Sequence, residues 1–254
     1  MKKLLSLLLL TGTLFAQANN VFTLNPSVNS AGMGNVGIAN ADVKNVFHNP
    51  AFAGLRESHQ EVSYVDWLPN LTDDMGYQSI LYTSDLGWSS ELFYFNYGEQ
   101  TQSDQYGVIL GDFESASFRI SGGWGFGYKD WLVGARLNLY NHSFIDDFDI
   151  DMNYGFDIGA YKEFGDTSIG IVLKDVGGET KFLDQELNLP MSVGIGVGHK
   201  IGNFTLASDV KVFEDYNSIG LGGEYNLGIA SLKLGYYTES EFDVDYLTFG
   251  GGID

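Results

Sequence analysis

The sequence predicts an all-β protein, a transmembrane antiparallel β-barrel with an N-terminal hatch and a cleaved signal peptide. Three observations lead to this fold class. After residue 60, about twelve runs alternate apolar and polar side chains, most of them about ten residues long. Glycine is frequent, with 33 residues, and aromatic residues make up 15% of the chain. Beyond the N-terminal segment, no stretch approaches 18 consecutive apolar residues, so we expect no transmembrane helix.

The charge and the composition exclude several classes of protein. The 254 residues include 13 basic and 33 acidic side chains, which gives a formal charge of −20. A protein that binds nucleic acid needs a basic face, so we expect no nucleic-acid partner. The chain contains no cysteine, which excludes a disulfide framework, a cysteine zinc site and a thiol nucleophile.

The first 18 residues have the pattern of a secretory signal peptide. A basic start, Met1–Lys3, precedes an apolar stretch, Leu4–Phe15, and the small-residue cleavage pattern Ala16–Ala18. The alternative is a short anchor helix, but about twelve apolar residues are too few to span a bilayer comfortably. We therefore expect an exported protein whose mature chain starts near Asn19.

The alternation within the strand-like runs separates an apolar face from a polar one. From Trp131 to Tyr140, one face is apolar throughout and the other carries glycine and polar side chains. Strands of soluble proteins average about five or six residues, whereas about nine to eleven tilted residues cross a membrane. A soluble exported β-protein explains the alternation but not the sustained length, so the barrel is the favoured interpretation.

Charged residues in the middle of the strands lie on the polar face. In a soluble sandwich they would face water, but in a barrel they face the lumen, where they must pair or be hydrated. The predicted lumen-facing charges are Arg136, Asp157, Lys174, Asp209, Lys211, Glu224 and Lys233.

The segment from residue 30 to residue 55 does not read as a lipid-facing strand. It is rich in glycine and small residues, and it ends in the rigid turn Asn49-Pro50-Ala51. We expect a compact element packed inside the barrel, so the chain divides into a signal peptide (1–18), a hatch (19–58) and a barrel (59–254). The glycines of the hatch include Gly32 and Gly34.

Several motifs resemble an outer-membrane family that contains the FadL fatty-acid transporters and the PorV and PorQ proteins. The N-terminal signature is carried by Gly32-Met33-Gly34, by residues 39–42 and by Asn49-Pro50-Ala51. The later runs Leu173–Gly177 and Gly222–Tyr225, and Leu189-Pro190, are similar to the PorV/PorQ branch. The resemblance implies a bacterial outer-membrane barrel of about fourteen strands, with the hatch folded into the lumen and Asn49, Pro50 and Ala51 forming the hatch turn.

Two features depart from that family. The long extracellular insertions typical of fatty-acid transporters are missing. The sequence also ends on Gly250–Asp254, without the terminal aromatic residue common in outer-membrane barrels. We expect either a C-terminally truncated fragment or a smaller barrel, because an unclosed edge in lipid leaves backbone groups unpaired.

Other motifs give no specific signal for chemistry. The spacing Gly32-x-Gly34-x-x-Gly37 matches a dinucleotide fingerprint, but no βαβ unit surrounds it. Acidic residues at 146–151 lack the spacing of a calcium loop, and the four histidines lack metal-ligand spacing. We therefore expect no enzyme activity, no cofactor and no metal.

Three functional hypotheses remain. The first is a PorV/PorQ-type role in envelope transport or type IX-like protein secretion, with secretion components or cargo proteins as partners. The alternative is a FadL-like channel for small hydrophobic molecules. The second alternative is a soluble exported β-protein that binds a partner. In the first two, outer-membrane lipid surrounds the barrel.

Overall fold

The computed structural model describes residues 21–67, 74–104, 106–144, 152–177, 179–182, 185–240 and 244–253. The predicted signal peptide and the acidic stretch 146–151 lie outside the described residues, so both stay predictions. No helix in the described ranges is both long and apolar enough to cross a membrane.

In the described residues, twelve strands form one antiparallel sheet, in which strands adjacent in the sequence pair with each other and β7 pairs with β10. A separate hairpin of two short strands lies in the connection between β7 and β10. The strands of the large sheet are β1 (His59–Asp66), β2 (Gly76–Thr83), β3 (Trp88–Ser103), β4 (Ile109–Tyr128), β5 (Trp131–Phe144), β6 (Asn153–Phe164), β7 (Thr167–Gly177), β10 (Ser192–Ile201), β11 (Phe204–Phe213), β12 (Asn217–Asn226), β13 (Ala230–Glu239) and β14 (Val244–Ile253); the hairpin is β8 (Glu179–Phe182) and β9 (Gln185–Asn188). The predicted all-β fold class is confirmed, with twelve long strands where the resemblance implied about fourteen.

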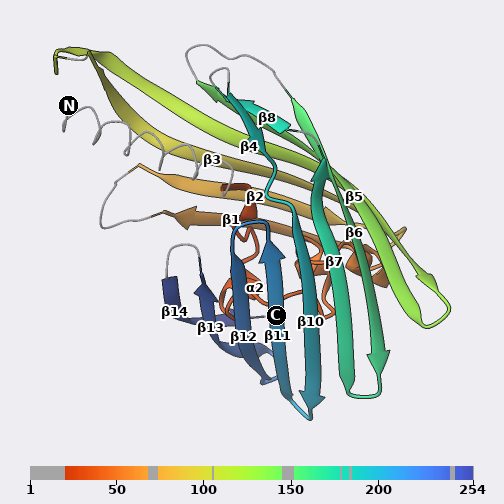
Figure 1. The fold of residues 1–254 in the computed structure, drawn as a ribbon. Helices are drawn as coiled ribbons and strands as arrows, with labels where there is room; N and C mark the ends of the chain where they lie inside the picture. Colours follow the sequence, from red (N-terminus) through yellow and green to blue (C-terminus); the bar gives the residue numbers. More distant parts are fainter. Residues whose placement is uncertain are drawn as a thin grey trace.

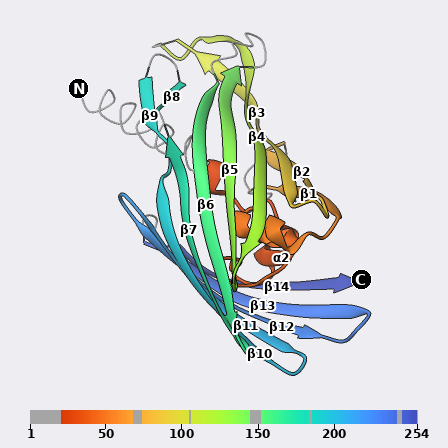
Figure 2. The ribbon, with the colours of Figure 1, turned by 90° about the vertical axis from the view of Figure 1, so that its right-hand side faces the viewer.

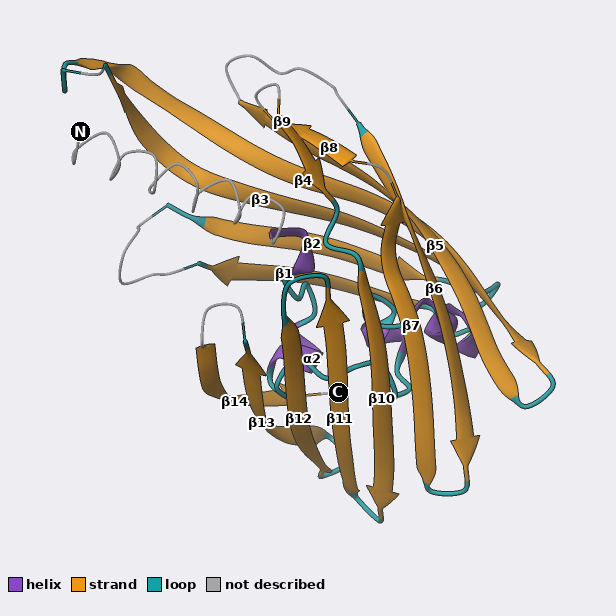
Figure 3. Cartoon of the chain, in the orientation of Figure 1, coloured by secondary structure: helices purple, strands orange, loops and turns teal. Residues whose placement is uncertain are grey.

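The sheet curls around the N-terminal segment, as the two orthogonal views show (Figures 1 and 2). That segment contains four short helical turns, η1 (Val21–Thr23), α2 (Val28–Ala31), η2 (Val43–Asn45) and η3 (Pro50–Leu55), which lie inside the curl (Figure 3). One sheet wrapped around the hatch differs from the two stacked sheets of a soluble sandwich.

The hatch contacts both edges of the sheet. In the described part of the chain, β1 and β14 each pair with one neighbour and not with each other. The Ser63 hydroxyl of β1 donates to the Pro26 carbonyl oxygen at 2.6 Å. The backbone N–H of Gly34 donates to the Thr248 hydroxyl of β14 at 2.9 Å. The N-terminal segment therefore links the two edge strands through side-chain hydrogen bonds.

The two ends of the barrel differ in their connections. At one end the strands are joined by short turns, such as Lys129-Asp130, Gly165-Asp166 and Gly202-Asn203, in which Lys129, Gly165 and Gly202 have positive φ. At the other end lie the longer connections, including the one that carries β8 and β9. We call these the short-turn end and the long-loop end.

The outer face of the sheet is apolar, whereas the inner face carries mostly glycine and polar side chains, with a group of buried aromatic side chains toward the long-loop end. Along β10, for example, Ser192 and its alternate glycines face the hatch, whereas Val193, Ile195 and Val197 are about half exposed on the outside. Exposed apolar side chains on the outer face include Val62, Ile80, Leu92, Ile120, Leu137, Ile158, Ile171, Val193, Ile195, Leu206, Val210, Ile219, Leu221, Leu232 and Leu234. This inverts the usual pattern of a water-soluble barrel, whose core is the apolar side.

Candidate functional site: the hatch and its anchors

The hatch, residues 21–58 of the described chain, fills the lumen. Most of its apolar side chains are buried, including Met33, Val36, Ile38 and Phe52, while Val28 is exposed. Buried polar groups that the short helical turns of the hatch leave unpaired need partners on the wall. The wall supplies them in three places: at the turn Asn49-Pro50-Ala51, along the inward-facing glycines, and at a group of buried charged side chains.

The hatch turn is fixed through the Asn49 side chain. Its amide oxygen accepts from the Ala51 N–H at 3.0 Å and caps η3, in which Pro50 is the first residue. Its amide nitrogen donates to the Ile38 carbonyl at 2.9 Å and to the Ala160 carbonyl of β6 at 3.2 Å. One side chain thus connects the turn to another part of the hatch and to the barrel wall.

Inward glycines let the turn lie directly against the wall. A Cβ at Gly134 on β5 would collide with the Pro50 backbone, and a Cβ at Gly159 on β6 would collide with the Asn49 side chain. Ala51 itself has no exposed surface. The turn residues Asn49, Pro50 and Ala51 therefore lie at the wall, in a space that only glycine on the strands leaves open.

A second row of glycines, the glycine cradle, lies on β10, β12 and β13. It consists of Gly194, Gly196, Gly198, Gly220, Gly222 and Gly235, and a Cβ at any of them would press on hatch residues 33–39 or on nearby polar side chains. Gly34, with φ +69°, sits between Gly220 and Gly235. Gly32 approaches Gly250 of β14, where its own Cβ would be 3.2 Å from the Gly250 Cα.

Four charged side chains form an ionic anchor on β3, β4, β5 and β6. Arg119 pairs with Glu91 at 2.9 Å, Arg136 pairs with the same carboxylate at 3.4 Å, and Arg136 pairs with Asp157 at 2.7 Å. None of the four side chains is more than 3% exposed. Buried charges are costly unless they are paired and hydrogen-bonded, and here each one has a partner of opposite sign.

A β-bulge adds two more charges to the ionic anchor. Between β6 and β7 the register shifts at Asp157, and Asp175 adopts a positive φ of 56°. As a result both Lys174 and Asp175 are buried, although neighbouring residues of a regular strand would point to opposite faces. The Asp175 N–H donates to Asp157 at 2.8 Å, and Tyr140 donates to the Asp175 carboxylate.

The hatch inserts an aromatic ring among these cations. The Phe47 ring lies 4.7 Å from the Arg119 guanidinium, 5.2 Å from that of Arg136 and 3.6 Å from the Lys174 ammonium nitrogen. Three cations from three strands thus surround one hatch side chain. Desolvated contacts of this kind contribute about 2 kcal/mol or more each in favourable cases. The ionic anchor therefore holds the hatch as well as the wall.

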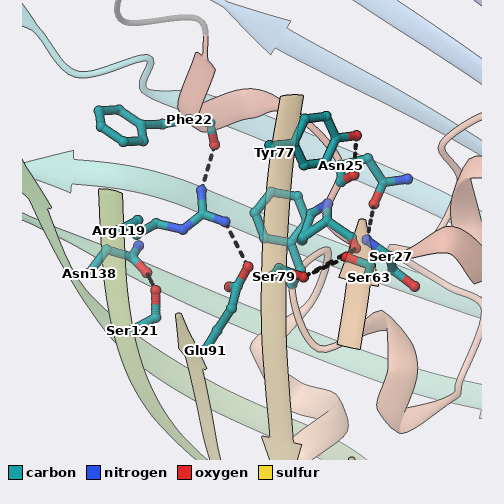
Figure 4. Close-up of polar contacts among 12 residues, drawn as sticks. Phe22, Asn25, Ser27, Ser63, Tyr77, Ser79, Glu91, Arg119, Ser121 and Asn138 are labelled. Atoms are coloured by element: carbon teal, nitrogen blue, oxygen red, sulfur yellow. Dashed lines mark hydrogen bonds and ion pairs between the residues drawn. The ribbon is translucent and has the colours of Figure 1, made fainter. Parts of the chain in front are cut away.

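The first residues of the hatch are held by their backbone carbonyls (Figure 4). Arg119 donates to the Phe22 carbonyl at 2.6 Å, in addition to its pair with Glu91. The Tyr77 hydroxyl donates to the Asn25 carbonyl at 2.9 Å. These side chains reach inward from β2 and β4, so this part of the hatch is tied to the wall near the long-loop end.

The remaining predicted charges lie on β11, β12 and β13. Asp209 accepts from the Gly37 and Ile38 N–H groups at 2.7 and 2.9 Å, and Lys211 lies 3.4 Å from the Asn35 carbonyl. Lys233 pairs with Glu224 at 2.9 Å, and the Glu224 side chain is 20% exposed. Asp209 and Lys211 thus contact the hatch, whereas Lys233 and Glu224 pair within the wall.

His48 lies beside the ionic anchor and has one free nitrogen. Its Nε2 is 2.9 Å from the Ser30 hydroxyl, and its Nδ1 is buried without a hydrogen-bond partner. Burial holds the pKa of His48 well below its usual value, and the positive charges of Lys211, Lys174 and Arg136 lower this pKa further. Near neutral pH, the lowered pKa favours the neutral imidazole while the hatch is in place.

The structure brings Arg136, Asp157 and Lys174 together, and it adds partners that sequence reasoning missed. Arg119 carries the same signal as the predicted charges, because it lies among inward serines at every second position of β4. Glu91 carries a weaker one, since its inward neighbours on β3 are Ser89 and Phe93. Phe47 gave no such signal. Among the described residues, no group of three or more histidine or acidic side chains is arranged to hold a metal ion.

Comparisons with known proteins give structural matches only. No protein-family model and no curated protein matches the sequence. The fold resembles the toluene transporter TbuX of Ralstonia pickettii, with a TM-score of 0.58, 14% identity, and coverage of 90% of this chain and 88% of the other. It also resembles a ΔS2S3 mutant of the monoaromatic hydrocarbon channel TodX, with a TM-score of 0.60, 12% identity, and coverage of 90% and 89%. The fold is therefore that of FadL-type outer-membrane barrels.

Proposed function

We propose that this protein is an outer-membrane channel for small hydrophobic molecules. Its outer face carries half-exposed aliphatic side chains on nearly every strand. Water-soluble monomers rarely expose contiguous apolar patches larger than a few hundred Å², whereas a barrel in lipid must do so. In bacterial barrels the short turns face the periplasm, which places the long-loop end outside the cell.

One observation carries the choice of ligand: an aromatic cluster inside the long-loop end. Phe22 of the hatch packs there with Tyr77, Phe93, Phe95 and Tyr140 of the wall, all at most 6% exposed. Trp67 borders this group, 6.4 Å from Phe95 between ring centroids. A lumen for ions or sugars would present polar groups here. Aromatic walls instead suit apolar and aromatic ligands.

The hatch closes the path beyond this cluster. The Phe22 ring is 4.7 Å from the Tyr140 ring, and the Phe22 carbonyl is held by Arg119. A ligand that enters the cluster competes with the Phe22 ring for the same wall surface. Passage then requires the first hatch residues to move, while the turn at Asn49 and the glycine cradle hold the rest. The mechanism involves no catalytic step.

The matched structures favour this function over the secretion hypothesis. The two proteins transport toluene or conduct monoaromatic hydrocarbons. Neither concerns protein secretion, so a PorV/PorQ-type role and its cargo partners have no support from them.

The test is uptake of labelled toluene into proteoliposomes that contain the full chain, with a labelled fatty acid and a labelled sugar as competing classes. We expect toluene uptake well above that of empty liposomes and no sugar uptake. Replacing Phe95 by Ser should reduce toluene uptake and binding, because it puts a hydroxyl into the aromatic wall. Quenching or a shift of Trp67 fluorescence reports binding directly, since Trp67 lies beside the cluster.

The matched control is Leu92→Ser on the outer face of the same strand, where Leu92 is 44% exposed. This variant should bind toluene like the parent protein. Sugar uptake equal to toluene uptake would contradict the proposal, and so would a fluorescence response that survives in the Phe95→Ser variant unchanged.

A further inference from the structure

The outer face carries one hollow that the channel function does not use. It has a volume of about 580 Å³ and runs across β10, β11, β12, β13 and β14 on the side away from the hatch. This is within the size range of pockets that hold organic ligands. The hollow is almost entirely apolar, since leucine, valine, tyrosine and glycine line most of it.

Strand register explains its shape. In one cross-strand row, Leu206 of β11 lies opposite Gly223 of β12, which lies opposite Leu234 of β13. In the next row toward the long-loop end, Leu221 lies opposite Tyr236. The side chains of these two rows border the hollow. Gly223 leaves room between Leu206 and Leu234 because it has no side chain. A Cβ at Gly223 would meet only the Leu206 side chain, at 3.4 Å.

The position of the hollow identifies what fills it. It lies in the apolar band of the outer face, continuous with half-exposed Val197 and Leu206. In the membrane placement proposed above, the molecules that contact this band are lipid acyl chains. A linear chain fits a groove between two rows of side chains, which are about two residues apart along each strand.

One end of the hollow offers polar partners for a headgroup. His199 lines the hollow two residues before the short-turn end of β10, and its Nδ1 is 2.9 Å from the Thr167 hydroxyl. An imidazole N–H at this end can donate a hydrogen bond to the phosphate that every phospholipid carries.

We propose that this hollow, the lipid groove, binds one phospholipid of the periplasmic leaflet, with an acyl chain between the two rows and its phosphate near His199. The inference rests on the membrane placement in the proposed function. It adds a specific ligand on the outside of the barrel, separate from the hydrophobic molecules that would pass through the lumen.

The test compares two glycine variants that both add a leucine to the outer face. Gly223→Leu fills the lipid groove. Gly122→Leu on β4 is the matched control, because a Cβ there has no atom within 4 Å and lies away from the groove. The full chain is purified in mild detergent, stripped of lipid, and titrated with phosphatidylglycerol and phosphatidylethanolamine while native mass spectrometry counts the bound lipid.

We expect one tightly bound phospholipid in the parent protein and in Gly122→Leu, and about tenfold weaker binding in Gly223→Leu. His199→Leu should weaken the binding of both phospholipids by a smaller factor. Equal lipid retention in both glycine variants would overturn the inference. It would also be overturned if Gly223→Leu only converted a dimer to a monomer without changing lipid binding, because the hollow would then be an interface between two copies.

Toluene uptake is measured on the same variants to separate the two proposals. Loss of lipid with intact uptake in Gly223→Leu supports the lipid groove as a site apart from the channel. Absence of uptake in every variant, including the parent, contradicts the channel while the lipid titration still decides the groove.

Discussion

The two walls of the barrel hold the same hatch by different means. Strands β3 to β6 reach it with long side chains, above all Glu91, Arg119, Arg136 and Asp157. Strands β10 to β13 present mostly glycine and serine, and the hatch backbone lies directly on them. The first wall adds buried charges to the glycine contacts that it makes with the turn at Asn49, whereas the second wall holds the hatch mainly through the absence of side chains, with Asp209 and Lys211 as its charged contacts.

The difference indicates which part of the hatch can move. A hatch backbone that rests on glycine is held by shape, and it can leave only if residues 33–39 are displaced as a unit. The first hatch residues are held by single hydrogen bonds to carbonyls, such as that from Arg119 to Phe22. These bonds can break one at a time. We therefore infer that the beginning of the hatch opens before the glycine cradle releases its centre.

The largest effect should come from breaking the ionic anchor. Asp157→Ala leaves Arg136 buried, with the longer contact to Glu91 as its remaining ion pair among the described residues. Removing one partner of a buried ion pair costs about 3–5 kcal/mol, because the other charge stays buried without compensation. We expect a loss of this size in the free energy of unfolding, measured by guanidinium denaturation in detergent micelles.

The control is the double variant Arg136→Met with Asp157→Leu, which removes both charges and keeps similar volume. It should lose clearly less stability than Asp157→Ala, since replacing a whole buried pair by apolar residues is often neutral. Equal losses in the single and double variants would show that the pair has no ionic role, and the contrast between the two walls would disappear.

An intermediate effect is expected at the glycine cradle. Gly235→Val places a side chain where the Gly34 backbone now lies. Overpacking of this kind costs about 1–3 kcal/mol, and the displaced hatch should become sensitive to protease. Gly122→Val on the outer face is the control, because its side chain would meet no atom within 4 Å. A hatch that stays protected in Gly235→Val would mean that it is not held by close backbone contact.

The sequence predicted which wall side chains face the lumen better than it predicted the contacts that these side chains make. Alternation alone assigned Arg136 and Asp157 to the inner face, and the register of β5 and β6 then places them opposite each other. The same alternation cannot predict Lys174 and Asp175 together in the lumen, because the β-bulge breaks the period of two. A bulge depends on the register between two strands, which one strand's pattern does not contain.

The hatch residues show the same limit. The sequence marks Asn49, Pro50 and Ala51 as a rigid turn, since proline fixes its own φ and restricts the residue before it. The cation contacts of Phe47 depend on how residues from β4, β5 and β7 converge in space. An isolated phenylalanine in a glycine-rich segment gives no sign of such neighbours, so tertiary structure was needed to find them.

The smallest expected effect is a pH dependence of hatch closure through His48. The pKa of His48 is lowered in the closed hatch, mainly by burial, and returns to about 6.5 when the hatch is released into water. Above that value both states are neutral and closure is unaffected. Below it the released state binds a proton that the closed state does not, so closure weakens by up to about 1.4 kcal/mol per pH unit until the lowered pKa is reached. Protease sensitivity of the hatch, measured between pH 7.5 and pH 5, should therefore rise toward acid in the parent protein and rise less in His48→Gln. The same rise in both would assign the effect to other groups.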